Sequence, residues 1–209
     1  MRLSRFYQYI NILSLDVVAG AVIGSLFFAR ISGASASLYS LLALALTVWI
    51  IYTLDHLRDA MFISDVASTD RHRFHQNHFR RITIILIAIA VIDFAVIWFV
   101  PQRVLLLGLG LWFVVAIYLA LQRQLKFMKE FFVACLYTAG LLIPTIGASE
   151  WDWIAVHYVL AGKYFITAWM NLLLFSLIDF NDDRQHQQHS FVTWFGPEST
   201  RYGIVFLGL

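Results

Sequence analysis

Charge is scarce in this chain of 209 residues, because Asp, Glu, Lys and Arg together make up only 13% of it. Soluble globular domains carry about 25% charged residues, so this composition excludes an ordinary water-soluble enzyme. The single cysteine, Cys135, excludes an intramolecular disulfide framework. The formal net charge of +2 gives no indication of a nucleic-acid partner, and we expect none. What the chain has in abundance is hydrophobic residues, 60% of the total, which is typical of a multi-pass membrane protein embedded in a lipid bilayer.

Six apolar stretches are long enough to cross a bilayer. A helix that spans about 30 Å of hydrocarbon needs roughly 17–25 mostly apolar residues. The sequence therefore predicts an all-α transmembrane helix bundle with six full spans and the start of a seventh near Tyr202, in a single domain over residues 1–209. The predicted spans are residues 10–29, 38–54, 82–100, 104–121, 131–148 and 156–178.

The basic residues concentrate on one side of the predicted bundle. If the N-terminus is cytoplasmic, every Lys and Arg falls on the cytoplasmic side except Arg30, Arg103 and Lys163. The positive-inside rule therefore predicts a cytoplasmic N-terminus. Two long polar loops, residues 55–81 and 179–200, then face the cytoplasm as well. Long charged loops on one side of a helix bundle are where function is expected.

Each of these two loops opens on paired aspartates at the end of a predicted span. Aspartates four residues apart on a helix share one face, with about 5–6 Å between them, so each pair presents two carboxylates together. Mg²⁺ prefers to be held by a few carboxylates plus phosphate oxygens. We therefore predict that two facing carboxylate clusters bind Mg²⁺ and a diphosphate. The predicted metal-binding and catalytic acids are Asp55, Asp59, Asp179, Asp182 and Asp183.

Basic and amide side chains near these acids are suited to contact a diphosphate. Asn171 lies eight residues, about two helical turns, before Asp179, so we expect it to face the same cavity. For the basic residues, membrane topology alone is an alternative explanation. The candidate substrate-binding residues are Arg58, Arg71, Arg73, Lys126, Lys129, Asn171 and Arg184.

Histidines in the same loops form a competing pattern. His72, His75 and His78 are spaced three residues apart, and His186 and His189 repeat this spacing in the second loop. Imidazole suits iron rather than Mg²⁺, so a di-iron membrane desaturase or hydroxylase is an alternative interpretation. The other interpretation is that these histidines lie at the membrane interface or form hydrogen bonds with the acids.

Ionisable residues inside the predicted spans form a third class. Asp16, Asp93 and Lys163 lie within or at the ends of apolar stretches, where an ionisable group is costly and points to a function or to a specific partner. For Asp93 we expect a hydrogen bond between helices.

The whole arrangement resembles the UbiA superfamily of intramembrane prenyltransferases. The resemblance rests on an acidic motif after the second span, another after the sixth, and a lysine-bearing start of the fifth. The segment DFNDDR at 179–184, followed by FGPE at 195–198, is similar to the second acidic motif of that family and the start of its seventh helix.

This resemblance implies a nine-helix bundle with a central cavity in which Mg²⁺ binds a polyprenyl diphosphate. The diphosphate leaves, an allylic carbocation forms, and an acceptor attacks it. For this chain we expect a lipophilic acceptor, with an aromatic one as an option. The resemblance further implies that Asp55, Asp59, Asp179 and Asp183 bind the metal. It also implies that the bases which contact the diphosphate are Arg71, Arg73, Lys126 and Lys129.

The chain departs from the pattern of that family at three places. Ile51 and Tyr52 stand where the first motif usually has Asn and Asp, so we expect a different metal affinity or substrate choice. His72, His75 and His78 stand where Arg-Pro and Gly are more common, so we expect a different lid over the acceptor. From the resemblance we also expect these 209 residues to lack the last helices of the family. A non-catalytic UbiA-like membrane protein is therefore a further alternative.

Overall fold

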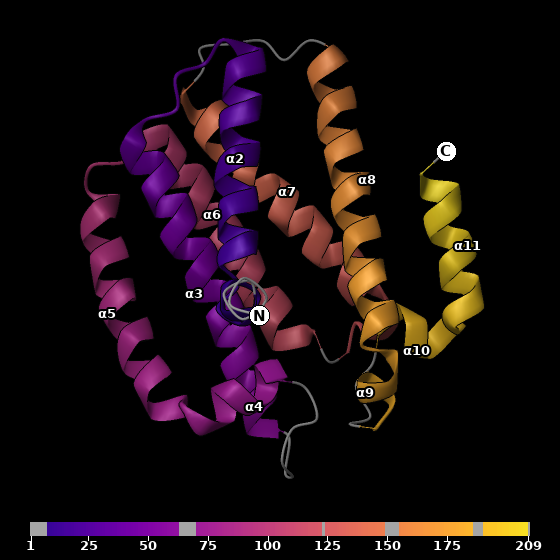
Figure 1. Ribbon diagram of the computed structural model, residues 1–209. Coiled ribbons are helices and arrows are strands. Elements are labelled where there is room, and N and C mark those ends of the chain that lie inside the picture. The colour runs from indigo at the N-terminus through magenta and orange to yellow at the C-terminus, as the bar shows by residue number, and fades with distance from the viewer. Residues whose placement is uncertain (1–7, 63–69, 123, 149–154, 186–189, 209) are drawn as a thin grey trace. The chain divides into compact units, whose positions relative to one another are not determined.

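The computed structural model describes residues 8–62, 70–122, 124–148, 155–185 and 190–208. Side chains within these helices that lie outside the description are those of Phe62, Asp70, Arg71, His72, Ala155, Asp182, Asp183 and Gln185. All regular elements in these ranges are helices, which confirms the predicted all-α class (Figure 1). The chain forms two compact units, one of Met1–Leu107 with Leu141–Ser149 and the other of Gly108–Gly140 with Glu150–Leu209. We call them the first and the second unit.

Five helical stretches are long and apolar enough to cross a membrane. They are Leu15–Ser32, Leu38–Met61, Gln102–Leu121, Lys126–Ala148 and Val156–Ile178. The helix predicted as the third span also forms, as α5 (Phe79–Ile97), but it carries Arg80, Arg81 and Asp93 and does not join this set. The structure therefore supports an integral membrane protein, while the count of six spans stays a prediction.

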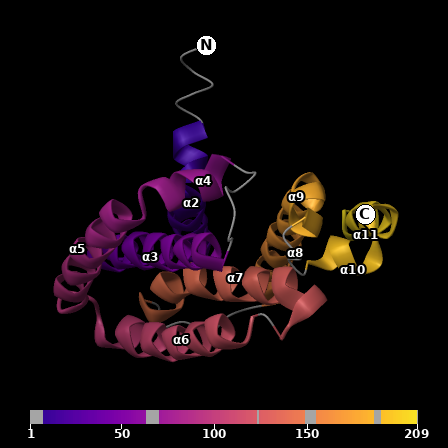
Figure 2. The same ribbon diagram turned by 90° about the horizontal axis from the view of Figure 1, so that it is seen from below.

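Helix α3 is the centre of the first unit. It spans Leu38–Phe62 and packs against α2 (Leu15–Ser32), α4 (Asp70–Asn77) and α5. Figure 2 shows α4 beside the end of α3. Trp49 and Ile50 of α3 pack against a core of buried leucine and isoleucine side chains, namely Leu57, Ile82 and Leu86.

Small residues let other helices of the first unit approach closely. The buried positions of α2 recur at intervals of three and four residues, so they form one stripe along the helix. Within this stripe the carbonyl of Ser25 accepts a hydrogen bond from Thr145 Oγ1 of α7 (Lys129–Ala148) at 3.3 Å. Gly147 of α7 lies against Val104 of α6 (Gln102–Leu121). A Cβ atom at Gly147 would lie 2.9 Å from the Val104 backbone, so only glycine fits there.

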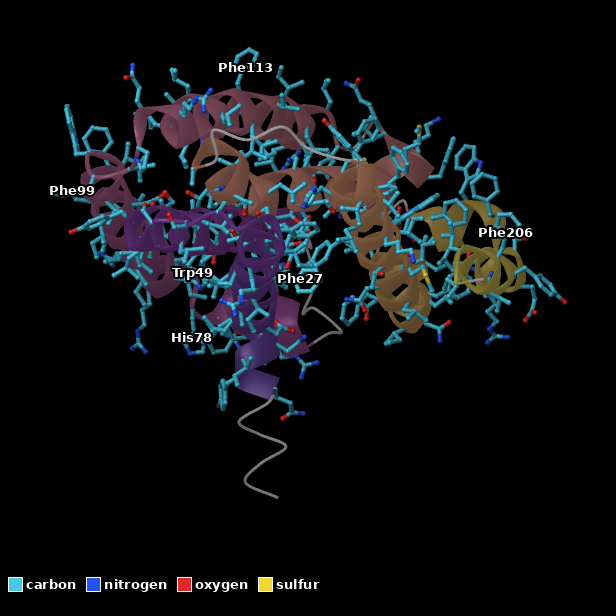
Figure 3. The ribbon with its side chains drawn as sticks, turned by 90° about the horizontal axis from the view of Figure 1, so that it is seen from above. Phe27, Trp49, His78, Phe99, Phe113 and Phe206 are labelled. Atoms are coloured by element: carbon cyan, nitrogen blue, oxygen red, sulfur yellow. The ribbon has the colours of Figure 1, made fainter. Side chains whose placement is uncertain are left out.

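The second unit is built around α8 (Ala155–Ile178) and the short helices that follow it. These are α9 (Phe180–Gln185), α10 (Phe191–Phe195) and α11 (Pro197–Leu207). Helix α11 packs along α8, and its residue Phe206 is 79% exposed (Figure 3). The rings of Phe131, Phe165 and Trp169 meet edge to face or stacked between α7 and α8. Aromatic pairs of this kind add specificity to helix packing in an apolar environment.

Several predicted boundaries were wrong, and each has a local cause. The first span was predicted from residue 10, but Ser14 has a φ of 55°, in the left-handed region, and α2 begins after it. The second span was predicted to end at residue 54, but α3 continues to Phe62 because its last turns are packed against other helices of the unit. The two regions predicted as loops are largely helical, since they contain α4, α9 and α10.

Candidate functional site

The first aspartate pair lies in the last turns of α3. Thr53, His56, Leu57 and Ala60 are buried at intervals of three, four and seven residues, so they form one packed face of the helix. Asp55 and Asp59 lie four residues apart and share another face of the helix. Both side chains are half-buried. The predicted arrangement of two carboxylates on one helical face is therefore present.

Residues from two other segments hold this end of α3 in place. The Ser14 hydroxyl lies 3.0 Å from His56 Nε2, at hydrogen-bonding distance. The rings of His56 and His75 lie 5.2 Å apart between α3 and α4, and both side chains are buried. The side-chain amide of Gln76 donates a hydrogen bond to the Ala60 carbonyl at 3.4 Å. The acid-bearing turns are thus anchored through His56 and Ala60, the residues that directly follow Asp55 and Asp59 in the chain.

An apolar core lies next to these contacts. Phe74 of α4 packs against the cluster of Leu57, Ile82 and Leu86, as does Trp49 of α3. Figure 3 labels Trp49 on α3 and His78 at the junction of α4 and α5. Because α4 contributes Phe74 to the core and His75 to the buried pair, its amphipathic sequence folds back onto α3 instead of forming an open loop.

The second acidic segment has a different geometry from the one predicted. Helix α8 ends at Ile178, the chain bends at Asp179, and α9 starts at Phe180. The Asp179 N–H still donates to the Phe175 carbonyl at 2.9 Å, so this residue closes the last turn of α8. Asp179 and Asp183 therefore do not lie on one continuous helix, because the bend separates them. The side chains of Asp182 and Asp183 lie outside the described residues.

The lysine-bearing segment lies in the same unit as Asp179. The short 3₁₀ helix η1 (Lys126–Met128) precedes α7, and Lys126 has a φ of 46°. This left-handed conformation is uncommon for a residue other than glycine. The Lys126 ammonium lies 5.2 Å from the centre of the Trp194 ring, within the range of a cation–π interaction. The ring of Phe127 also contacts Trp194 and Phe195, so η1 and α10 form one aromatic cluster.

Glu130 is a residue that the sequence reasoning missed. It is only 7% exposed, and its Oε1 accepts hydrogen bonds from Ser176 Oγ at 3.1 Å and from the Phe191 N–H at 2.9 Å. These bonds join the start of α7 to the end of α8 and the start of α10. An acid placed directly before the apolar run at 131–148 was the available signal.

Two aspartates that the sequence places in apolar helices, Asp93 and Asp16, have specific partners. The Thr47 hydroxyl donates to Asp93 Oδ2 at 2.8 Å, which confirms the predicted hydrogen bond between helices. Asp16 accepts a hydrogen bond from the Asn11 amide at 2.9 Å near the start of α2. Asn171 is exposed on α8.

The predicted site residues divide between the two units. Asp55, Arg58 and Asp59 lie together in the last turns of α3, and Arg73 lies on the adjoining α4. Lys126 in η1 and Lys129 at the start of α7 belong to the second unit with Asn171, Asp179 and Arg184. The Arg71 and His72 side chains, and the whole of His186 and His189, lie outside the described residues.

Among the described side chains, no three of His, Cys, Asp or Glu come together as a metal-binding group. This finding does not exclude Mg²⁺, which keeps several waters and takes its other ligands from substrate phosphates. The two carboxylates of Asp55 and Asp59, and that of Asp179, are oxygen donors of the type that Mg²⁺ accepts. By donor type, each acidic segment taken by itself fits a magnesium ion that also has a diphosphate as a ligand.

Comparison with known proteins supplies one further finding. No protein-family model and no curated protein matches the chain. Among solved structures, a UbiA homologue from Archaeoglobus fulgidus, bound to DMAPP and Mg²⁺, is similar with a TM-score of 0.68. The match has 18% sequence identity and covers 95% of this chain and 73% of that chain. At this identity the likeness establishes the fold, and the chain therefore has a UbiA-like fold.

Proposed function

We propose that this protein is a Mg²⁺-dependent membrane prenyltransferase. It moves a polyprenyl group from a polyprenyl diphosphate to a lipophilic acceptor, for which an aromatic ring is the first class to test. The observation that carries the proposal is the combination of a UbiA-like fold with aspartates in the last turns of α3 and at the end of α8. The similar structure supports the donor class, because it holds DMAPP, a prenyl diphosphate, together with Mg²⁺.

The metal would be held by aspartates of both acidic segments. We assign this role to Asp55 and Asp59 on α3, and to Asp179, Asp182 and Asp183 at the end of α8 and on α9. When bound, Mg²⁺ neutralises the negative charge that develops on the departing diphosphate. Because Asp55 and Asp59 share one face of α3, a rigid helix fixes the spacing of their two carboxylates.

The basic residues bind the diphosphate and stabilise it as a leaving group. We assign this role to Arg58, Arg71, Arg73, Lys126, Lys129 and Arg184, with Asn171 as an amide contact. In the reaction, the bond between the prenyl C1 and the diphosphate oxygen breaks, and its electron pair stays with the diphosphate. The acceptor supplies the electron pair of the new bond to C1, and it loses a proton. Arginine and lysine side chains stabilise charge of this kind without taking part in covalent chemistry.

The proposed orientation follows from charge. With a cytoplasmic N-terminus, the acidic segments face the cytoplasm, where a charged diphosphate is soluble. The acceptor reaches the protein from the lipid bilayer, which is consistent with five helices apolar enough to span it.

The experiment that tests the proposal is Mg²⁺-dependent binding of geranylgeranyl diphosphate to the detergent-purified chain, with DMAPP as a shorter probe. The matched control is the double variant Asp55→Ala/Asp179→Ala. Binding that requires both Mg²⁺ and these acids supports the donor site. Binding that persists without Mg²⁺ or in the double variant contradicts it.

The alternatives have distinct outcomes in the same preparation. Stoichiometric iron in the purified wild-type chain would indicate the His-based di-iron enzyme. A folded chain that binds neither iron nor a prenyl diphosphate would indicate a non-catalytic UbiA-like membrane protein. Among the described residues, His56 and His75 lie against each other, and no group of three or more His, Cys, Asp or Glu side chains that could hold iron is found.

A further inference from the structure

The carboxylate of Glu130 connects three elements of the second unit through one oxygen atom. Glu130 Oε1 accepts both the Ser176 hydroxyl of α8 and the Phe191 N–H of α10, while Glu130 itself lies in the first turn of α7. Ser176 and Glu130 are each less than a tenth exposed. A buried donor that loses its acceptor costs free energy, so both bonds stabilise this arrangement.

These two bonds lie on either side of the second acidic segment. Ser176 is three residues before Asp179, and Phe191 follows the segment as the first residue of α10. The start of α10 is fixed further by a capping box, in which Ser190 Oγ accepts the Thr193 N–H and Thr193 Oγ1 accepts the Ser190 N–H. Both ends of the stretch that carries Asp179 are therefore attached to a single buried oxygen.

Glu130 also lies next to the lysine-bearing segment. Glu130 directly follows Lys129, and η1 before it is packed through Phe127 onto Trp194 and Phe195 of α10. Its place in the first turn of α7 also favours a negative charge, because the helix dipole is positive at that end. The second carboxylate oxygen, Oε2, is buried and has no hydrogen-bond partner among the described residues.

We propose that Glu130 is a positioning residue that holds the Asp179 segment in register with Lys126 and Lys129. This inference rests on the proposed function, since it assigns Asp179 to the metal and the two lysines to the diphosphate. Its physical basis is independent of that function, because a buried acceptor that serves two donors fixes the chain on both sides of the acidic segment. Removal of the acceptor leaves the Ser176 and Phe191 donors unsatisfied and frees both ends.

The test compares Glu130→Ala with Glu130→Gln in the full chain. The Gln side chain keeps an oxygen that can accept both bonds, whereas Ala removes it. Two quantities are measured: amide hydrogen exchange of α9 and α10, and the Mg²⁺-dependent Kd for geranylgeranyl diphosphate. For Glu130→Ala we expect amide exchange to accelerate about tenfold and the Kd to rise about tenfold. A change of this size corresponds to the loss of roughly one buried hydrogen bond. Glu130→Gln stays close to wild type in both.

The matched control is Glu198→Ala, which removes an exposed glutamate that pairs only locally with Arg201. It should leave both quantities unchanged. If Glu130→Ala does not fold, Ser176→Ala removes one of the two bonds and should give a smaller change in the same direction.

The outcomes separate the two proposals. Unchanged exchange and Kd in Glu130→Ala and Ser176→Ala would overturn the positioning role. A Kd that rises equally in Glu130→Gln and Glu130→Ala, with exchange unchanged in the Gln variant, would also overturn it, because it would assign Glu130 to direct ligand binding. If wild-type protein binds no prenyl diphosphate, the proposed function fails, and the exchange measurement alone decides the role of Glu130.

Discussion

The hydroxyl of Thr47 donates a hydrogen bond of 2.8 Å to the carboxylate of Asp93, and this bond joins α3 to α5 in the first unit. Asp93 is buried, and its second oxygen, Oδ1, has no partner among the described residues. A buried carboxyl group in apolar surroundings is costly unless it is hydrogen-bonded. The Thr47 hydroxyl is therefore expected to contribute to the stability of the helix that carries Asp55 and Asp59.

Thr47→Val tests this contribution. The substitution keeps the shape of the side chain and removes the donor, so we expect the free energy of unfolding to fall by about 0.6–1.7 kcal/mol. Thermal unfolding in detergent measures the change. Thr83→Val is the matched control, because the Thr83 hydroxyl only donates to the Phe79 carbonyl of its own helix and is exposed. Equal stability of the two variants would show that the Thr47–Asp93 bond contributes nothing measurable.

Gly147→Ala tests the close contact between α6 and α7. A Cβ atom at this position would lie 2.9 Å from backbone atoms of Val104, so the helices must separate, and we expect destabilisation by about 1–3 kcal/mol. The control is Gly108→Ala, where a Cβ atom meets nothing within 4 Å. Because alanine favours a helix more than glycine does, this control should be neutral or slightly stabilising. A lower melting temperature for Gly108→Ala than for Gly147→Ala would contradict the packing shown here.

Asp55→Asn and Asp179→Asn test the two acidic segments separately. Each substitution removes a charge while keeping the size of the side chain, so we expect prenyl transfer to fall at least about a hundredfold with expression intact. Turnover with a radiolabelled prenyl diphosphate measures the loss. Glu198→Gln removes a charge from the exposed surface of α11 and should retain activity. Full activity in both Asp variants would rule out the proposed metal and diphosphate site.

Ile51→Asn tests the departure of this chain from the UbiA pattern. Position 51 is one helical turn before Asp55 on α3, so an amide there adds an oxygen ligand near the pair. We expect the apparent Mg²⁺ affinity for donor binding to rise about threefold or more. Leu54→Asn introduces the same amide at an exposed position of the same helix and serves as the control. An affinity that stays at the wild-type value in Ile51→Asn would speak against a site at this end of α3.

His75→Ala distinguishes a packing role from iron ligation. The His75 side chain is 2% exposed and its ring lies against that of His56, so truncation leaves a cavity and should destabilise the first unit by about 2–4 kcal/mol. We expect no stoichiometric iron in the wild-type protein. When His72 and His78 are replaced by Ala together with His75, we expect acceptor use to change. Loss of bound iron on substitution, measured by elemental analysis, would instead support the di-iron alternative.

The helical class was predictable because hydrophobic length is a property of the sequence alone. In a bilayer, the backbone of a long apolar stretch must form its hydrogen bonds within a helix, so residues 104–121 and 156–178 were placed almost correctly. Helix ends were less predictable. The left-handed Ser14 and the extension of α3 past Asp55 depend on contacts made by distant residues.

Parts of the candidate site were also predictable. The spacing of Asp55 and Asp59 places them on one helical face wherever the helix is continuous. In the structure, α3 runs without a break through both residues. The rule does not apply to Asp179 and Asp183, because the chain bends at Asp179 and α9 begins as a new helix. Two residues four apart in the sequence share a face only where both lie in one continuous helix.

The sequence by itself determined a chain of apolar helices with paired aspartates at two of their ends, since length, hydropathy and helical periodicity act locally. The tertiary structure alone decided that His56 meets His75, and that Glu130 joins Ser176 to Phe191. These pairs are separated by 19 to 61 positions in the chain, so no local pattern indicates them. Buried polar groups need partners, and which partners they find is decided by how the helices pack.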